Sequence, residues 1–175
     1  MRKALYILGD LDEHDLIWMA RHGEVINLSK RDILIKAGAA VDHLYFVTEG
    51  ELSVHLANGQ AIATMGVGDV IGEMSFVEKR PPSVSVQAKN SCRLLRIPRT
   101  ALIEEFGRNT GFAARFYRAL AVFLSDRLRT ASEAGSGKGS SPIDNELDEG
   151  LLDTLHVAGD RMRRMIDMLE GRMRV

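Results

Sequence analysis

Gly66–Val86 reads GVGDVIGEMSFVEKRPPSVSV and is the most informative segment of this chain. At its centre, Ile71-Gly72-Glu73-Met74-Ser75 leaves an apolar strand through a glycine and enters what reads as a short helical turn. Backbone N–H groups at the start of such a turn favour an anion, and a neighbouring carboxylate accepts hydrogen bonds from sugar hydroxyls. The combination predicts a site for a ribose phosphate.

The sequence around this segment alternates apolar with polar residues, which is the period of a β-strand. The alternating positions are Ile26 and Leu28, Ile33 and Ile35, Leu52, Val54 and Leu56, and Val84, Val86 and Ala88. Turn signals such as Glu49-Gly50 separate these runs, and Asn58-Gly59 predicts a two-residue hairpin. Roughly seven or eight short strands with such turns predict a small antiparallel barrel or jelly roll over residues 24–97.

Helical spacing flanks the strands. Residues 12–22 have an apolar face with Asp12 as the N-cap, residues 98–106 predict a short helix, and residues 112–131 a longer one. We therefore expect one domain over residues 1–131.

The last part of the chain has a different composition. Residues 132–143 are rich in glycine and serine, which predicts a flexible linker. Residues 144–175 carry apolar side chains every three or four positions, with an acidic start and a basic end, which predicts an amphipathic helix. Its apolar stripe must dock on the domain, pair with a second copy of the chain, or bind another protein.

Composition excludes several classes of protein. The 175 residues carry 23 Lys and Arg against 24 Asp and Glu, so no basic excess is available to coat a nucleic acid. The single cysteine, Cys92, allows no intrachain disulfide and is most simply a core residue, which favours a reducing, cytoplasmic location. No apolar run reaches the roughly 18 residues of a membrane span, and the apolar stretch near the N-terminus is too short for a secretory signal.

The order and spacing of the motifs resemble the cyclic nucleotide-binding domain family, the β-roll module of the catabolite activator protein, protein kinase A regulatory subunits and gated ion channels. The resemblance covers roughly residues 5–130. It implies a mainly β fold, an antiparallel β-roll (double-stranded β-helix or jelly roll) followed by C-terminal helices. The matching positions are Gly38, Asp42–Val47, Glu49-Gly50, Gly66-Val67-Gly68-Asp69, Ile71–Ser75, Val84–Ala88 and Ile97-Pro98-Arg99.

The resemblance also implies a ligand site. In the family, a phosphate-binding cassette uses the backbone at the positions of Met74 and Ser75, and the position of Glu73 takes the ribose 2′-hydroxyl. An arginine nine residues after the glutamate pairs with the phosphate, but Pro82 stands there in this chain. Arg80, two residues earlier, is the candidate replacement. The predicted ligand-binding residues are Gly72, Glu73, Met74, Ser75, Arg80, Pro82, Ser83 and Val84.

The expected function is that of a regulatory sensor. A cyclic nucleotide, cAMP or cGMP, fills the pocket, and no other cofactor is required. Residues 112–129 then move to cover it, and the linker and the last helix carry the shift to another protein or to a second copy of the chain. A serine at position 83, after the expected arginine, is associated with guanine preference in this family. The alternative is a degenerate domain without a ligand, acting as a dimerisation or protein-interaction module, which Pro82 favours.

Other functions have less support in the residues. The five histidines include no His-x-His pair of the kind that binds metal in cupin jelly rolls, and a hairpin at Glu49-Gly50 places His43 opposite Leu56 and His55 on the other face. No Gly-x-Ser-x-Gly elbow or Ser/His/Asp spacing indicates an enzyme. The residues after Ile143 read as one helix rather than a helix-turn-helix, which argues against DNA binding.

Overall fold

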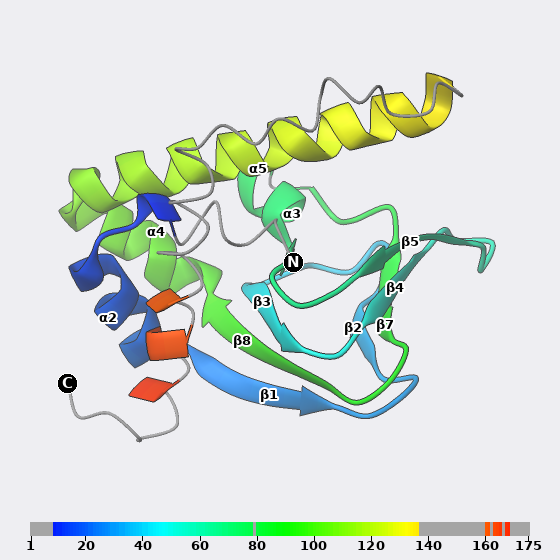
Figure 1. Cartoon of the computed structure of the whole chain (residues 1–175), viewed down its shortest axis with the longest axis horizontal. Coiled ribbons are helices and arrows are strands. Elements are labelled where there is room, and N and C mark those ends of the chain that lie inside the picture. The colour runs from blue at the N-terminus through cyan, green and yellow to red at the C-terminus, as the bar shows by residue number, and fades with distance from the viewer. Residues whose placement is uncertain (1–8, 79, 137–159, 162, 166, 169–175) are drawn as a thin grey trace.

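The structure, a computed structural model, describes residues 9–78, 80–136, 160, 161, 163–165, 167 and 168 (Figure 1). Its centre is a β-roll of two four-stranded antiparallel sheets, β1-β8-β3-β6 and β2-β7-β4-β5. The strands are β1 Glu24–Leu28, β2 Ile33–Ile35, β3 His43–Glu49, β4 Leu52–His55, β5 Ala61–Met65, β6 Val70–Ile71, β7 Ser85–Ala88 and β8 Cys92–Pro98. The predicted antiparallel β-roll with flanking helices is confirmed.

Helices flank the roll on one side, where Figure 1 shows α2, α4 and α5 gathered together and α3 between α5 and the strands. They are α2 Glu13–His22, α3 Glu73–Glu78, α4 Arg99–Arg108 and α5 Thr110–Ser136. The predicted N-cap of the first helix is present: the Asp12 carboxylate accepts a hydrogen bond from the Asp15 N–H, and the Asp15 carboxylate accepts one from the Asp12 N–H.

A hairpin forms at Asn58-Gly59, with a loop longer than the two residues predicted, whereas no hairpin forms at Glu49-Gly50. β4 and β5 pair across Asn58-Gly59, with His55 opposite Ala61 and Gly59 at a φ of +84°. The chain at Glu49-Gly50 instead crosses between sheets, so His43 lies opposite Pro98 and the predicted pairing with Leu56 is wrong. The reason is tertiary: β3 pairs with β6 and β8, and β4 pairs with β5 and β7, so the strands on either side of this turn belong to different sheets. A Cβ at position 50 would lie 2.4 Å from the carbonyl oxygen of Ser91, so the crossing requires a glycine there.

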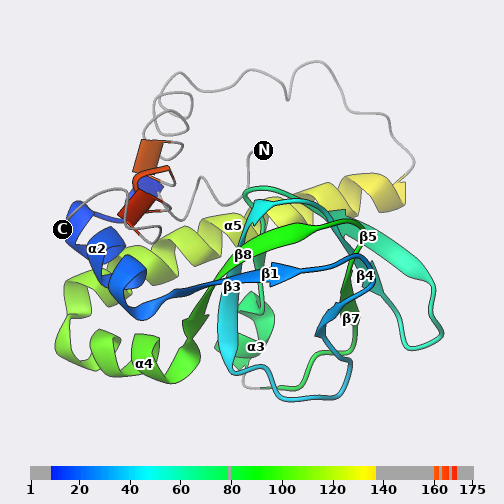
Figure 2. The same cartoon turned by 90° about the horizontal axis from the view of Figure 1, so that it is seen from below.

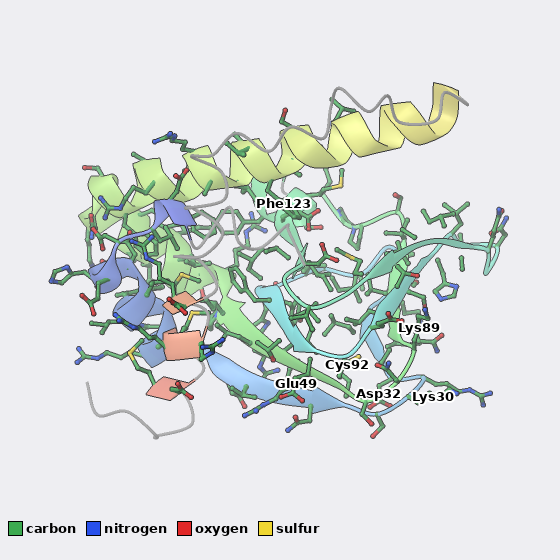
Figure 3. The ribbon with its side chains drawn as sticks, viewed as in Figure 1. Lys30, Asp32, Glu49, Lys89, Cys92 and Phe123 are labelled. Carbon is green, nitrogen blue, oxygen red and sulfur yellow. The ribbon has the colours of Figure 1, made fainter. Side chains whose placement is uncertain are left out.

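Two apolar cores result from the alternation along the strands. The neighbouring residues Leu94 and Leu95 are both fully buried because they point to opposite faces of their sheet. Leu94 enters the core inside the roll, and Leu95 enters the core beneath the helices. Cys92 is buried in the inner core, as expected, with its Sγ 3.1 Å from the carbonyl oxygen of Glu51 (Figure 3).

The last helix of the domain is longer than predicted. α5 continues to Ser136, five residues beyond 131 and into the predicted linker. Residues 131–134 read Ala-Ser-Glu-Ala, which contains no helix breaker, so the helix continues through them. The rest of the predicted linker, residues 137–143, lies outside the described residues.

Part of the predicted helix 144–175 is described, and it docks on the domain. Asp160, Arg161, Arg163–Met165, Asp167 and Met168 are helical, and we call them the tail segment. Both views place the tail segment beside α2 (Figures 1 and 2). Met165 has 0% exposure and belongs to the core beneath the helices. Docking on the domain is therefore the outcome for this part of the predicted helix.

Candidate functional site

A pocket of about 310 Å³ lies between the interior of the roll, α3 and the loop that follows α3. This volume falls in the range of small-molecule sites. All eight predicted ligand-binding residues line it: Gly72, Glu73, Met74, Ser75, Arg80, Pro82, Ser83 and Val84. The structure therefore brings together residues that the sequence places on both sides of α3.

The turn into α3 depends on a glycine. Gly72 has a φ of +91°, and a Cβ there would lie 2.8 Å from the carbonyl oxygen of His43. Both facts exclude a side chain without rearrangement. The carbonyl oxygen of Gly72 accepts a hydrogen bond from the N–H of Phe76 at 3.0 Å, so the residue that follows β6 also begins the first turn of α3.

Two polar side chains at the start of α3 are buried against the pocket. Glu73 is 4% exposed and Ser75 is 7% exposed, whereas Met74 between them is 55% exposed. Buried acidic side chains are rare because burial penalises their charge. A buried carboxylate on a pocket wall is therefore a strong candidate for a group that accepts hydrogen bonds from a ligand.

The loop after α3 is held against the end of β2. The N–H of Gly38 donates to the carbonyl oxygen of Pro82 at 2.8 Å, and the N–H of Ala37 donates to Ser85 Oγ at 3.0 Å. These bonds place Pro82, at the position where the family has its arginine, half-buried in the pocket wall. Ser83 follows it at the exposed rim.

The charges around the pocket are few. Among the described residues of its lining, Arg80 is the one basic side chain, and it is exposed at the rim. Glu73 and Glu78 are the acidic ones. An anionic ligand in this pocket thus has a single described cation to pair with.

One wall of the pocket is apolar, and the sequence analysis did not assign it to the site. It consists of Ile35, Val54, Met65, Ile71 and Val86, which come from β2, β4, β5, β6 and β7. Strand alternation identifies most of these positions as inward-facing. It does not reveal that five strands direct them to one cavity. Glu78 and Pro81 also line the pocket and were not predicted.

The four described histidines are not grouped into a metal site. In the part of the chain that the structure describes, no three His, Cys, Asp or Glu side chains are grouped so as to hold a metal ion. Partial burial, together with the positive charge of Arg96, lowers the pKa of His43 below its usual value.

Among the described residues, no helix is both long and apolar enough to cross a bilayer.

Known proteins are similar to this chain in sequence and in fold. Residues 25–109 match the family model of the cyclic nucleotide-binding domain. The potassium channel AKT2 of Oryza sativa subsp. japonica is 29% identical over 106 residues, which are 58% of this chain and 12% of the channel. Glutaminase 2 of Bradyrhizobium diazoefficiens is 28% identical over 126 residues, 72% of this chain and 20% of that protein. The chain thus spans a fifth or less of these two curated relatives.

A solved structure adds the fold-level comparison. A cyclic nucleotide-binding domain from Methylobacillus flagellatus superposes with a TM-score of 0.69 and 21% identity, covering 79% of this chain and 84% of that one. The match of the family model lies over the strands, α3 and the pocket described above. Residues 25–109 of the chain therefore form a domain of the cyclic nucleotide-binding family, as the resemblance of its motifs predicted.

Proposed function

We propose that this chain binds a cyclic nucleotide, cAMP or cGMP, in the 310 Å³ pocket and passes the binding event to its C-terminal helices. The observation that carries the proposal is the buried Glu73 carboxylate on the wall of a pocket whose opposite wall is apolar. A nucleotide has the matching halves, since its base is a flat and largely apolar ring and its ribose offers hydroxyl groups.

The pocket suggests an orientation for the ligand. The apolar wall packs against the base, and the Glu73 carboxylate accepts a hydrogen bond from the ribose 2′-hydroxyl. The backbone of Met74 and Ser75 at the start of α3 approaches the cyclic phosphate. Arg80 supplies the countercharge from the rim, in place of the arginine that Pro82 replaces.

The position of Arg80 sets the expected strength of binding. A buried arginine–phosphate pair contributes about 1.5–3 kcal/mol, which corresponds to roughly 10- to 100-fold in affinity. A pair at an exposed rim contributes less because water and salt screen it. We therefore expect weaker and more salt-sensitive binding than a buried arginine provides.

The route to the helices starts at α3. Phe76 of α3 lies 5.8 Å from Phe116 of α5 and 6.3 Å from Phe106 of α4, measured between ring centroids. A ligand that shifts α3 must therefore repack this aromatic cluster or move α5 with it. Binding changes the position of α5 only to the extent that the ligand prefers one arrangement over the other.

Calorimetric titration with cAMP and with cGMP tests the proposal on the native chain, a Glu73→Gln variant and a Glu104→Gln control. Glu104 is exposed on α4 and does not line the pocket. We expect the native chain and the Glu104→Gln control to bind at least one of the two nucleotides, and to bind it with the same dissociation constant. Glu73→Gln should weaken binding by about 10-fold or more, because a charged acceptor is lost. Unchanged affinity in Glu73→Gln contradicts the ribose contact.

The second candidate is a protein-interaction module without a ligand, and Pro82 at the arginine position favours it. Native mass spectrometry on the purified protein detects a nucleotide that copurifies. If none copurifies, and neither nucleotide produces heat or a melting shift at millimolar concentration, the sensor is excluded and this candidate is retained. A ligand at about 100 times its dissociation constant adds roughly 2.7 kcal/mol of stability, which a melting curve resolves.

A further inference from the structure

The tail segment makes its contacts with the beginning of the chain. Arg161 Nη1 donates a hydrogen bond to the carbonyl oxygen of Gly9 at 2.7 Å. Arg164 Nη1 lies 3.8 Å from the Glu13 carboxylate, and both side chains are exposed. Met165, between these basic residues and Met168, is the one fully buried side chain among the described tail residues. The segment therefore docks through one apolar anchor with a polar edge.

The surface that receives the tail segment is formed by residues 9–20, and we call it the N-terminal face. Leu11, Leu16 and Met19 are buried in the same core as Met165, and Trp18 packs against that core. At its edge, Glu13 lies beside Arg164 of the tail segment, whereas Asp10 and Asp12 lie against Arg118 and Arg115 of α5. An apolar surface with an acidic contact at its edge fits a helix that carries arginines next to a buried methionine.

The N-terminal face has its own attachment to the domain. Arg115 of α5 contacts the carboxylates of Asp12 and Asp15, and the rings of Trp18 and Phe112 lie 5.6 Å apart. None of these contacts involves the tail segment. Departure of the tail therefore leaves α2 tied to α5, with an uncovered apolar surface beside it.

We propose that the N-terminal face is a docking site for a basic amphipathic helix, and that the chain's own tail segment is its exchangeable, intramolecular occupant. The buried Met165, the Arg161 hydrogen bond to Gly9 and the Arg164–Glu13 ion pair carry the proposal. It does not depend on the nucleotide site, so either can fail without the other.

The test uses the full chain in three forms: native, Met165→Asp and Met165→Leu. Aspartate removes the anchor, whereas leucine keeps its volume and apolarity. The probe is a fluorescently labelled peptide with the sequence of residues 157–175, and its binding is followed by anisotropy. Trp18, the single tryptophan of the chain, provides a second signal at the N-terminal face itself.

We expect Met165→Asp to bind the peptide at least 10-fold more tightly than the native and Met165→Leu chains. The reason is that a tethered tail competes at an effective concentration near millimolar. A peptide carrying the same aspartate should not bind. A Glu13→Arg change in the Met165→Asp chain should weaken the native peptide by about two- to five-fold, and an Arg164→Glu peptide should recover the loss.

Three results overturn the proposal. The first is equal binding of the peptide to the native and Met165→Asp chains, and the second is absence of binding to a Met165→Asp chain whose melting curve shows it folded. If that variant does not fold, Met165→Ala takes its place under the same criteria. The third is a concentration-dependent dimer of the native chain that Met165→Asp abolishes, because the occupant is then the tail of a second copy.

Discussion

Replacing Arg115 with methionine should destabilise the domain by removing the ion pair that ties α5 to α2. Arg115 Nε and Nη2 donate to the two carboxylate oxygens of Asp15 at 2.7 and 2.9 Å, and Nη2 also lies 2.8 Å from Asp12 Oδ2. The Asp15 side chain is 1% exposed, so the variant leaves a buried carboxylate without its cation. Methionine keeps the apolar stem of the side chain and removes the charge.

The magnitude follows from the burial of the two partners. Removing one partner of a buried ion pair costs about 3–5 kcal/mol, and a hydrogen bond to a charged group contributes about 1.5–3 kcal/mol. The Arg115 side chain is 35% exposed, so water screens the pair and the lower range applies. We expect a loss of about 2–3 kcal/mol, or a fall in melting temperature of roughly 4–12 °C for a chain of this length.

Urea denaturation of the native chain, Arg115→Met, Asp15→Asn and the double variant measures the effect as a cycle. The double variant should lose less than the sum of the single variants, because the second change no longer breaks a pair. The Asp15 hydrogen bond, acting against partial burial, raises the pKa of Arg115, so the guanidinium stays charged throughout the assay. A loss below about 0.5 kcal/mol in Arg115→Met, or strict additivity, would refute the reasoning.

Three further predictions concern the pocket and the sheet beside it. Gly72→Ala should lower the free energy of unfolding, measured by chemical denaturation, by about 1–3 kcal/mol, because residue 72 has a positive φ and lies close to the His43 carbonyl. Gly59→Ala, also at positive φ but with nothing within 4 Å of its Cβ, should lower it less. Equal losses in the two variants exclude the steric explanation. Arg80→Gln should lower nucleotide affinity by about two- to five-fold at low ionic strength and have little effect at 1 M salt, with the exposed Lys30→Gln as control, and a salt-independent loss contradicts a rim contact. Because the pKa of His43 is lowered in the fold, the unfolded chain binds more protons below pH 6.5, so stability falls as the pH drops below that value. His43→Gln should flatten this part of the stability–pH profile. If the profile is unchanged, the loss of stability at low pH is not due to His43.

Local signals predicted the parts of the fold that depend on a few neighbouring residues. Asp12 begins a helix because its carboxylate reaches the N–H three residues later, and the chain turns at Asn58-Gly59 because Gly59 tolerates its φ of +84°. The same holds at the site, where Ile71-Gly72-Glu73 specifies a strand, a turn and a helix start in consecutive positions. These are interactions between near neighbours, and the sequence displays them directly.

Contacts between distant segments decided what the sequence by itself left open. Strand alternation marks Val54 and Val86 as inward-facing, but only the pairing of the strands directs both to one pocket. The backbone hydrogen bond between Gly38 and Pro82 joins segments far apart in the chain and helps to position the loop that carries Arg80. Met165 repeats at helical spacing like its neighbours, yet it alone among the described tail residues is fully buried. Periodicity shows which face of an element avoids water, whereas the partner for that face depends on shape and charge brought together by the whole fold.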